Sequence, residues 1–154
     1  MVFSSGVATA AFASANAGLS VPVAISNLSL SGADAINYNV ADITGVTANI
    51  TPATLTATVN AFTKVYDGNT TATPTLTITS GLVGSETLGL TGTATFADKN
   101  VGTAKTVTVN TVSLSDGNNG GLASNYSLAA GETTSANITP KALTISACLC
   151  LEMP

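Results

Sequence analysis

The chain is informative first in what it lacks. Its 154 residues include no His, only 8% are charged, and the only cations are four lysines. Without His, neither a Ser-His-Asp nor a Cys-His arrangement can form. The lysines are scattered, whereas a nucleic-acid-binding surface needs cations clustered against phosphates. We therefore expect a protein that is not an enzyme, has no cofactor and does not bind nucleic acid.

Long apolar runs are missing, and so are cysteines in the body of the chain. No run reaches 18 apolar residues, so no membrane-spanning helix is expected. Cys148 and Cys150 both lie in the last seven residues. A disulfide two positions apart would be strained, and two thiols without His make a poor zinc site. We interpret the cysteines as an incidental part of the tail, and they do not determine the redox compartment.

What is abundant favours β-strands. Thr and Val fit a pleated surface and lose rotamer freedom in a helix. Apolar residues alternate with Thr or Asn in residues 55–61, 75–79 and 106–110, and the intervening turns are rich in Gly, Asp and Asn. We predict an all-β protein with about seven strands per complete unit, arranged as an antiparallel, Ig-like β-sandwich. A β-grasp-like repeat is the alternative, because strand count does not fix connectivity.

An internal repeat organises the chain. Ala-Asn-Ile-Thr-Pro occurs at 48–52 and again 88 residues later at 136–140. Residues 12–18 match 96–102 at an offset of 84, and the loop 116–124 is four residues longer than its counterpart, so the later offset is 88. We predict a first repeat at 1–52 that lacks its opening part, a complete repeat at 53–140, and the start of a third at 141–154 that ends in an aberrant tail.

Two consequences follow from this alignment. We interpret the small apolar residues at the N-terminus as a repeat segment, and a signal peptide is the minor alternative because no Lys or Arg precedes them. Pro52 and Pro140 end one unit directly before the next begins, so neighbouring units should be joined stiffly and nearly end to end. The first repeat should expose unpaired sheet edges or borrow pairing from the second.

The motifs of the complete unit resemble a known family. They are Lys-Val-Tyr-Asp-Gly-Asn-Thr at 64–70, Gly-Leu-Val-Gly-Ser-Glu at 81–86, Asn-Val-Gly at 100–102, Asn-Tyr-Ser-Leu at 125–128 and Ile-Thr-Pro at 138–140. In this order they resemble the YDG-type repeats, whose motif is here Tyr66, Asp67 and Gly68, and the related MBG repeats. Such repeats occur in tandem in large bacterial surface and secreted proteins of the filamentous-haemagglutinin and adhesin kind. The resemblance implies an extracellular or cell-surface location, a stalk or adhesive array and no catalytic residues.

Several side chains are candidates for binding. Asp67, Asn69, Asp116 and Asn118 offer oxygen ligands for calcium in loops, although neither loop has the D-x-[DN]-x-[DN]-G pattern and turn formation explains them better. Tyr66 is either a ligand-stacking aromatic or, as we favour, a core residue whose hydroxyl caps a loop. Lys64 or Lys141 is a less favoured candidate for an isopeptide bond with an Asn.

Two functional hypotheses follow. The first is a non-catalytic structural or stalk module of a bacterial cell-surface or secreted adhesin, with neighbouring repeats as partners. The second is an adhesive module that itself binds host glycan or matrix. The sequence does not identify a ligand, parent protein or host.

Overall fold

The computed structural model describes residues 8–41 and 43–145, so Cys148 and Cys150 lie outside the described residues. The chain divides into two compact units. Unit 1 comprises Met1–Leu55, Gly81–Leu88 and Asp116–Ser127, and unit 2 comprises Thr56–Ser80, Gly89–Ser115 and Leu128–Pro154. Regular structure in the described ranges consists of β-strands and two short 3-10 turns, which confirms the all-β prediction. These ranges contain no helix long and apolar enough to cross a membrane. The predicted repeat boundaries stay predictions.

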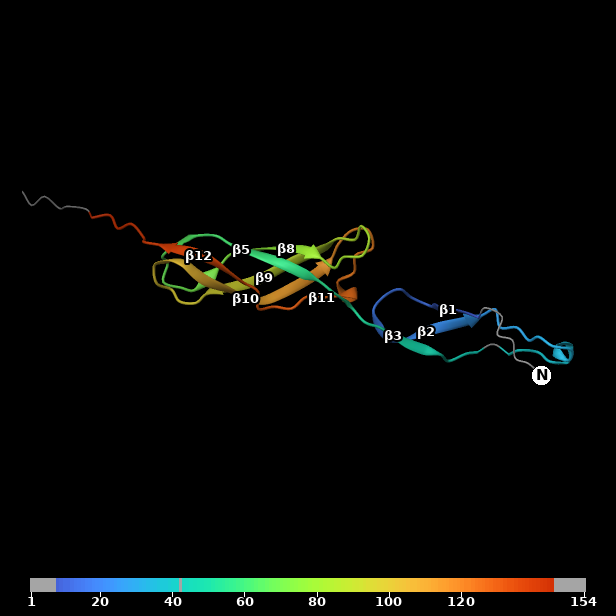
Figure 1. The fold of residues 1–154 in the computed structure, drawn as a ribbon. Helices are drawn as coiled ribbons and strands as arrows, with labels where there is room; N and C mark the ends of the chain where they lie inside the picture. Colours follow the sequence, from blue (N-terminus) through green and yellow to red (C-terminus); the bar gives the residue numbers. More distant parts are fainter. Residues whose placement is uncertain (1–7, 42, 146–154) are drawn as a thin grey trace, which may run out of the picture. The chain divides into compact units, whose positions relative to one another are not determined.

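Unit 2 contains two layers of strands (Figure 1). One layer is a five-stranded sheet in the order β6-β12-β10-β9-β7. Its strands are β6 (Lys64–Val65), β7 (Thr71–Ala72), β9 (Leu88–Phe96), β10 (Gly102–Asp116) and β12 (Thr133–Thr139), of which β9 and β10 begin or end in unit 1. The other layer is an antiparallel pair, β5 (Thr56–Ala61) and β8 (Pro74–Ser80). This two-layer packing is what a sandwich requires, and Ig-like connectivity stays a prediction.

The alternation read from the sequence builds the core between these layers. Val107 and Val109 of the five-stranded sheet are 0% and 1% exposed. Val59 of β5 belongs to the same buried cluster, and Leu76 of β8 packs against it. The intervening threonines face outward and bond across strands, as in the 2.7 Å contact between the Thr93 and Thr111 hydroxyls. One face of the sheet is therefore apolar and covered, and the other is polar.

Two short pairings are parallel. In unit 2, β12 pairs with β6 through Ile138 opposite Lys64. In unit 1, β11 (Tyr126–Ser127) pairs with β4 (Ala53–Thr54). The remaining pairings with a stated register are antiparallel, as predicted. The parallel pairs join the beginning of the complete repeat to its end, a connection that the predicted, wholly antiparallel arrangement did not include.

Unit 1 contains a three-stranded antiparallel sheet in the order β1-β2-β3 (Figure 1). Its strands are β1 (Thr9–Phe12), β2 (Gly18–Ser26) and β3 (Thr47–Ile50). The short turn η1 (Ala35–Asn37) lies between β2 and β3 in the chain, and η2 (Ala123–Asn125) precedes β11. Within the described part of the chain, β1 and β3 have no strand on their outer sides, so this sheet has two open edges.

The β1-β2-β3 sheet has the internal geometry of β9-β10-β12 in unit 2. Its β2–β3 register shifts between Gly18 and Val21, and the β10–β12 register shifts between Gly102 and Lys105, 84 residues later. At these bulges Ser20 and Ala104 have φ values of 53° and 48°. The Ser20 and Ala104 amides donate to the side-chain oxygens of Asn49 and Asn137 at 2.9 and 2.8 Å. Residues equivalent in the alignment therefore take equivalent backbone positions.

Candidate functional site

The Tyr-Asp-Gly motif forms a turn that its own side chains close. It follows β6 in unit 2, and the Tyr66 amide donates to the Thr139 carbonyl at 2.8 Å. Asp67 Oδ1 accepts the Asn69 amide at 3.1 Å, so Asp67 bridges the turn in the way Asp residues commonly do. Gly68 has φ +82°, a left-handed conformation that is costly for residues with a Cβ. The Asp and Gly of the motif are thus explained by the turn itself.

The Lys64 ammonium lies at the centre of this turn. It contacts Asp67 Oδ1 at 2.8 Å and Asn69 Oδ1 at 2.9 Å. It also donates to the main-chain carbonyls of Asn69 and Thr71 at 2.9 and 3.0 Å. The ammonium lies 5.7 Å from the centre of the Phe96 ring, a cation–π contact that links the turn to the core. Four oxygens and one aromatic ring therefore surround a single lysine.

The charge of Lys64 affects the neighbouring acid. Its hydrogen bond to the Asp67 carboxylate, together with the bond from the Asn69 amide, holds the pKa of Asp67 below its ordinary value. The structure places Lys64 beside both an Asn amide and an acid, Asn69 and Asp67. An isopeptide bond at Lys64 stays an untested prediction.

The four residues predicted as calcium ligands divide into two places. Asp67 and Asn69 come together, but around Lys64, whose ammonium occupies the position that a metal ion would take between their oxygens. In unit 1, Asp116 Oδ1 accepts the Ala123 amide at 2.8 Å, and Asn118 uses its main-chain amide to reach Thr87 Oγ1 at 2.8 Å. The side-chain oxygens of Asp67, Asn69 and Asp116 thus serve as internal caps, and calcium binding by either loop stays an untested prediction.

The same lysine–aspartate arrangement recurs at another turn of unit 2. The Lys105 ammonium is ion-paired with Asp98 Oδ1, which also accepts the Asn100 amide at 2.8 Å. The hydrogen bond from Lys105 is the main cause that lowers the pKa of the Asp98 carboxyl. In the first repeat the equivalent residues are Val21 and Ser14. Ser14 Oγ still accepts the Asn16 amide, at 3.1 Å, so the turn survives without the ion pair.

A shallow hollow lies beside the Tyr-Asp-Gly turn. Its lining includes Phe62, Lys64, Asp67, Asn69 and Phe96. Phe62 is 63% exposed, so its ring is available at the surface. Tyr66 is half-buried and packs against the core, as favoured from the sequence. The aromatic side chain offered to solvent here is therefore Phe62, which the sequence reasoning did not select.

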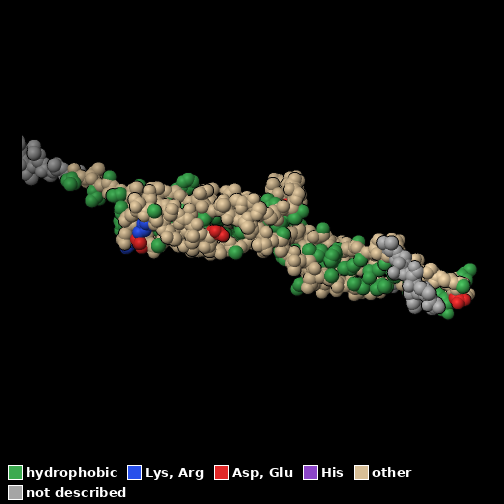
Figure 2. All heavy atoms as spheres, viewed as in Figure 1, with side chains coloured by type: hydrophobic (Ala, Val, Ile, Leu, Met, Phe, Trp, Pro, Cys, Tyr) green, Lys and Arg blue, Asp and Glu red, His purple; other side chains and the backbone are tan. Residues whose placement is uncertain are grey.

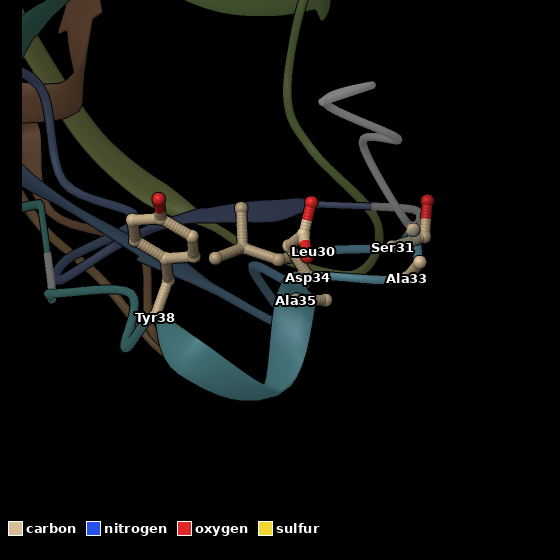
Figure 3. Close-up of a pocket in the computed structure, with 7 residues that line it drawn as sticks. Leu30, Ser31, Ala33, Asp34, Ala35 and Tyr38 are labelled. Atoms are coloured by element: carbon tan, nitrogen blue, oxygen red, sulfur yellow. The ribbon is translucent and has the colours of Figure 1, made fainter.

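The loop-capping hydroxyl belongs to Tyr126 rather than Tyr66. In unit 1, the Tyr126 hydroxyl accepts the Val83 amide at 3.1 Å and donates to Glu86 Oε2 at 2.5 Å. The bond to the Glu86 carboxylate is the main cause that raises the pKa of Tyr126. Tyr126 is 6% exposed, whereas its counterpart Tyr38 is 56% exposed. Figure 3 shows Tyr38 beside Leu30 and Asp34 at an open pocket next to η1.

Comparison with known proteins identifies the family. The model of the YDG domain matches residues 2–45 and 51–136, which is most of the chain. No curated protein and no solved structure matches the chain. The match confirms the resemblance inferred from the motifs and falls on both predicted repeats. The chain therefore belongs to the YDG domain family.

Proposed function

We propose that this YDG repeat is a non-catalytic structural module, working as a stalk or spacer in a bacterial cell-surface or secreted adhesin. The observation that carries the proposal is the internal use of its chemically capable side chains. Lys64 holds the Tyr-Asp-Gly turn, and Lys105 pairs with Asp98. Tyr126 and Glu86 hold a loop of unit 1. Each group stabilises the fold rather than presenting itself to a substrate.

Neighbouring repeats are the natural partners of such a module. Within unit 1, Asn125 Oδ1 accepts the Ala17 amide at 2.8 Å, and its Nδ2 donates to Asn16 Oδ1 at 3.1 Å. These contacts bring residues of the first and second predicted repeats into one compact unit. They support a role in which repeats are joined in series.

A second candidate function is glycan or matrix binding at the hollow beside the Tyr-Asp-Gly turn. The specific observation in its favour is an exposed aromatic ring, Phe62, next to the polar groups of Lys64, Asp67 and Asn69. Sugars are bound by stacking on aromatic rings and by hydrogen bonds to adjacent polar groups. The polar groups here are engaged with one another, which favours the structural proposal.

A glycan and matrix-protein array separates the two functions. The full chain and its Phe62→Ala variant would be applied in parallel, with and without calcium. The structural proposal predicts no signal above background for either protein. Reproducible binding by the full chain that Phe62→Ala abolishes would contradict the spacer function and establish the adhesive one.

A further inference from the structure

The complete repeat carries a longer loop than its counterpart, and that loop contains a reactive pair of residues. Residues 116–124 are four residues longer than the equivalent loop of the first repeat, and they include Asn119-Gly120. Asn119 is the only asparagine of the 154-residue chain that is followed by Gly. Asparagine is a thermolabile residue, and a following Gly exposes its side-chain carbonyl carbon most fully to the next main-chain nitrogen.

The loop is tied to the segment Gly81–Leu88 within unit 1. The Thr87 amide donates to the Asn118 carbonyl at 3.2 Å, and the Asn118 amide donates to Thr87 Oγ1 at 2.8 Å. Asn119 Nδ2 donates to the Ser85 carbonyl at 2.9 Å. The two loops lie side by side in Figure 1, and backbone and uncharged polar atoms dominate their surface in Figure 2. A single side-chain amide thus helps to hold together residues that are 34 positions apart.

The Gly120 amide is placed to act as a nucleophile. Within the part of the chain that the structure describes, it donates no hydrogen bond, whereas the Gly121 amide donates to the Asn118 carbonyl at 3.1 Å. Asn119 and Gly120 are both exposed, with φ values of 57° and 88°, so water reaches the pair. Gly120 has no Cβ to hinder the approach of its nitrogen to the Asn119 side chain. The nitrogen therefore has neither a competing acceptor nor a steric shield.

We propose that Asn119-Gly120 is a self-modification site, at which the loop converts its own asparagine into isoaspartate and aspartate. The Gly120 nitrogen loses its proton and bonds to Asn119 Cγ, the Cγ–Nδ2 bond breaks, and Nδ2 leaves as ammonia. Water then opens the resulting succinimide ring at one of its two carbonyls. Opening at Cγ gives aspartate, and opening at the main-chain carbonyl gives isoaspartate. The net reaction consumes one water, releases one ammonia and needs no other reactant.

Either product removes the tie between the two loops. The Ser85 carbonyl loses its donor when Nδ2 of Asn119 departs. The new carboxylate also lies near the Glu86 side chain, because the position of a Cβ on Gly120 is 4.0 Å from Glu86 Oε1. Two negative charges at this range repel each other. The Glu86 carboxylate accepts the Tyr126 hydroxyl, so the repulsion acts on the cap of the same loop.

Isoaspartate has a further effect, because it lengthens the main chain by one methylene group. Gly117 and Gly121 lie so close to Thr87 that a Cβ on them would be 2.0 and 2.1 Å from its carbonyl oxygen. The Gly117 amide also donates to the Gly121 carbonyl at 2.9 Å and closes the turn. A longer backbone does not fit this packing, so the modified loop separates from Gly81–Leu88. The proposal goes beyond the spacer function and does not depend on it.

The chemical step is tested on the full chain, kept for several weeks in warm neutral buffer. Peptide mapping by mass spectrometry should locate the exchange of NH2 for OH at Asn119, and an isoaspartyl methyltransferase should label the same peptide. Asn100 is the internal control, because it is also an exposed asparagine of a turn but is followed by Val101. Equal conversion at Asn119 and Asn100, or no conversion at Asn119, would overturn the proposal.

Hydrogen exchange of the fresh and the aged chain tests the separation of the loops. The Thr87, Gly117 and Gly121 amides should exchange roughly two- to tenfold faster after ageing, the factor that corresponds to one lost hydrogen bond. The Val109 amide, which donates to the Glu132 carbonyl in unit 2, should exchange at an unchanged rate and so show that the sheet stays folded. Unchanged exchange at all three loop amides would overturn the conclusion that the modification opens the loop.

Two variants separate the reaction from its effect. Asn119→Gly suits the left-handed backbone and cannot form a succinimide, so its loop amides should exchange equally before and after ageing. Asn119→Asp carries the new carboxylate and lacks the donor to Ser85, so its loop should exchange faster than that of the fresh natural chain. Ageing that loosens the Asn119→Gly loop as much as the natural one would place the change elsewhere, for example at Asp116-Gly117, and overturn the proposal.

Discussion

Phe12 and Phe96 occupy equivalent positions in two copies of one sheet, yet Phe12 is 47% exposed and Phe96 is 3% exposed. Both close a strand of the same register, and both precede a turn whose next amide bonds to the neighbouring strand, Ala13 to Pro22 and Ala97 to Thr106. The difference between them is the layer formed by β5 and β8. That layer, rather than the sheet itself, completes the core of the repeat.

Truncation of the two phenylalanines should therefore have unequal effects. Phe96→Ala removes a ring from a closed core and should lower the free energy of unfolding by about 3–5 kcal/mol. Phe12→Ala removes a ring that is already half in water and should cost less than about 1 kcal/mol. Urea unfolding of each variant measures both values. Similar losses for the two variants would show that Phe12 is also covered in solution.

Removal of the Lys64 ammonium should destabilise unit 2. Lys64→Met retains the apolar stem but leaves the oxygens of Asp67, Asn69 and Thr71 without their donor. Loss of charge-assisted hydrogen bonds predicts a decrease of about 1–3 kcal/mol in the free energy of unfolding. Lys99→Met is the matched control, because Lys99 is exposed and forms no ion pair within the described ranges. Equal melting temperatures for the two variants would refute the structural role of Lys64.

Acid should weaken the fold through Asp67 and Asp98. Hydrogen bonds from Lys64 and Lys105 lower the pKa of both carboxyls in the folded state. Unfolded aspartates titrate at about 3.9, so the folded chain binds fewer protons just below that pH. The stabilisation is therefore complete above about pH 5 and is lost as pH falls through the folded pKa values. Asp67→Asn with Asp98→Asn should flatten this acid limb in melting curves at constant ionic strength, and an unchanged slope would argue against the assignment.

Calcium should have no effect on stability. A ligand that binds only the folded state raises the melting temperature. The oxygens of Asp67 and Asn69 already bind the Lys64 ammonium, and the Asp116 carboxylate caps the Ala123 amide. Melting curves in calcium and in chelator should therefore coincide. An upward shift in calcium would restore the metal-site hypothesis and indicate that one of these caps opens to admit the ion.

Much of the fold was accessible from the sequence because alternation and repetition are periodic signals. The alternation around Val107 and Val109 predicted a strand with one buried face, and both valines are buried. The 84- and 88-residue offsets predicted which residues share a backbone position, as Ser20 and Ala104 do. The parallel pairing through Lys64 was not accessible, because β6 contains only two residues and carries no period.

The candidate site was harder to predict from the sequence, because its contacts join residues that the fold brings together. Residue type identified Asp67 and Asn69 as oxygen donors but could not show that Lys64 binds them. Position at a strand end suggested a capping hydroxyl on Tyr66, whereas the cap comes from Tyr126 and reaches a loop 40 residues earlier at Glu86. The local sequence pattern thus predicts which chemical group is present, whereas only the tertiary structure shows which residue it bonds to.

Native-state hydrogen exchange compares the two copies most directly. The Ala13 and Ala97 amides donate to equivalent carbonyls at 2.8 and 2.9 Å, and the Ser20 and Ala104 amides donate to equivalent Asn oxygens. These matched local bonds leave the covering layer as the main difference within each pair. We predict that Ala97 and Ala104 exchange at least about a hundredfold more slowly than Ala13 and Ser20, which corresponds to roughly 3 kcal/mol. Equal protection within each pair would contradict the conclusion that residues 53–87 close the core of the repeat.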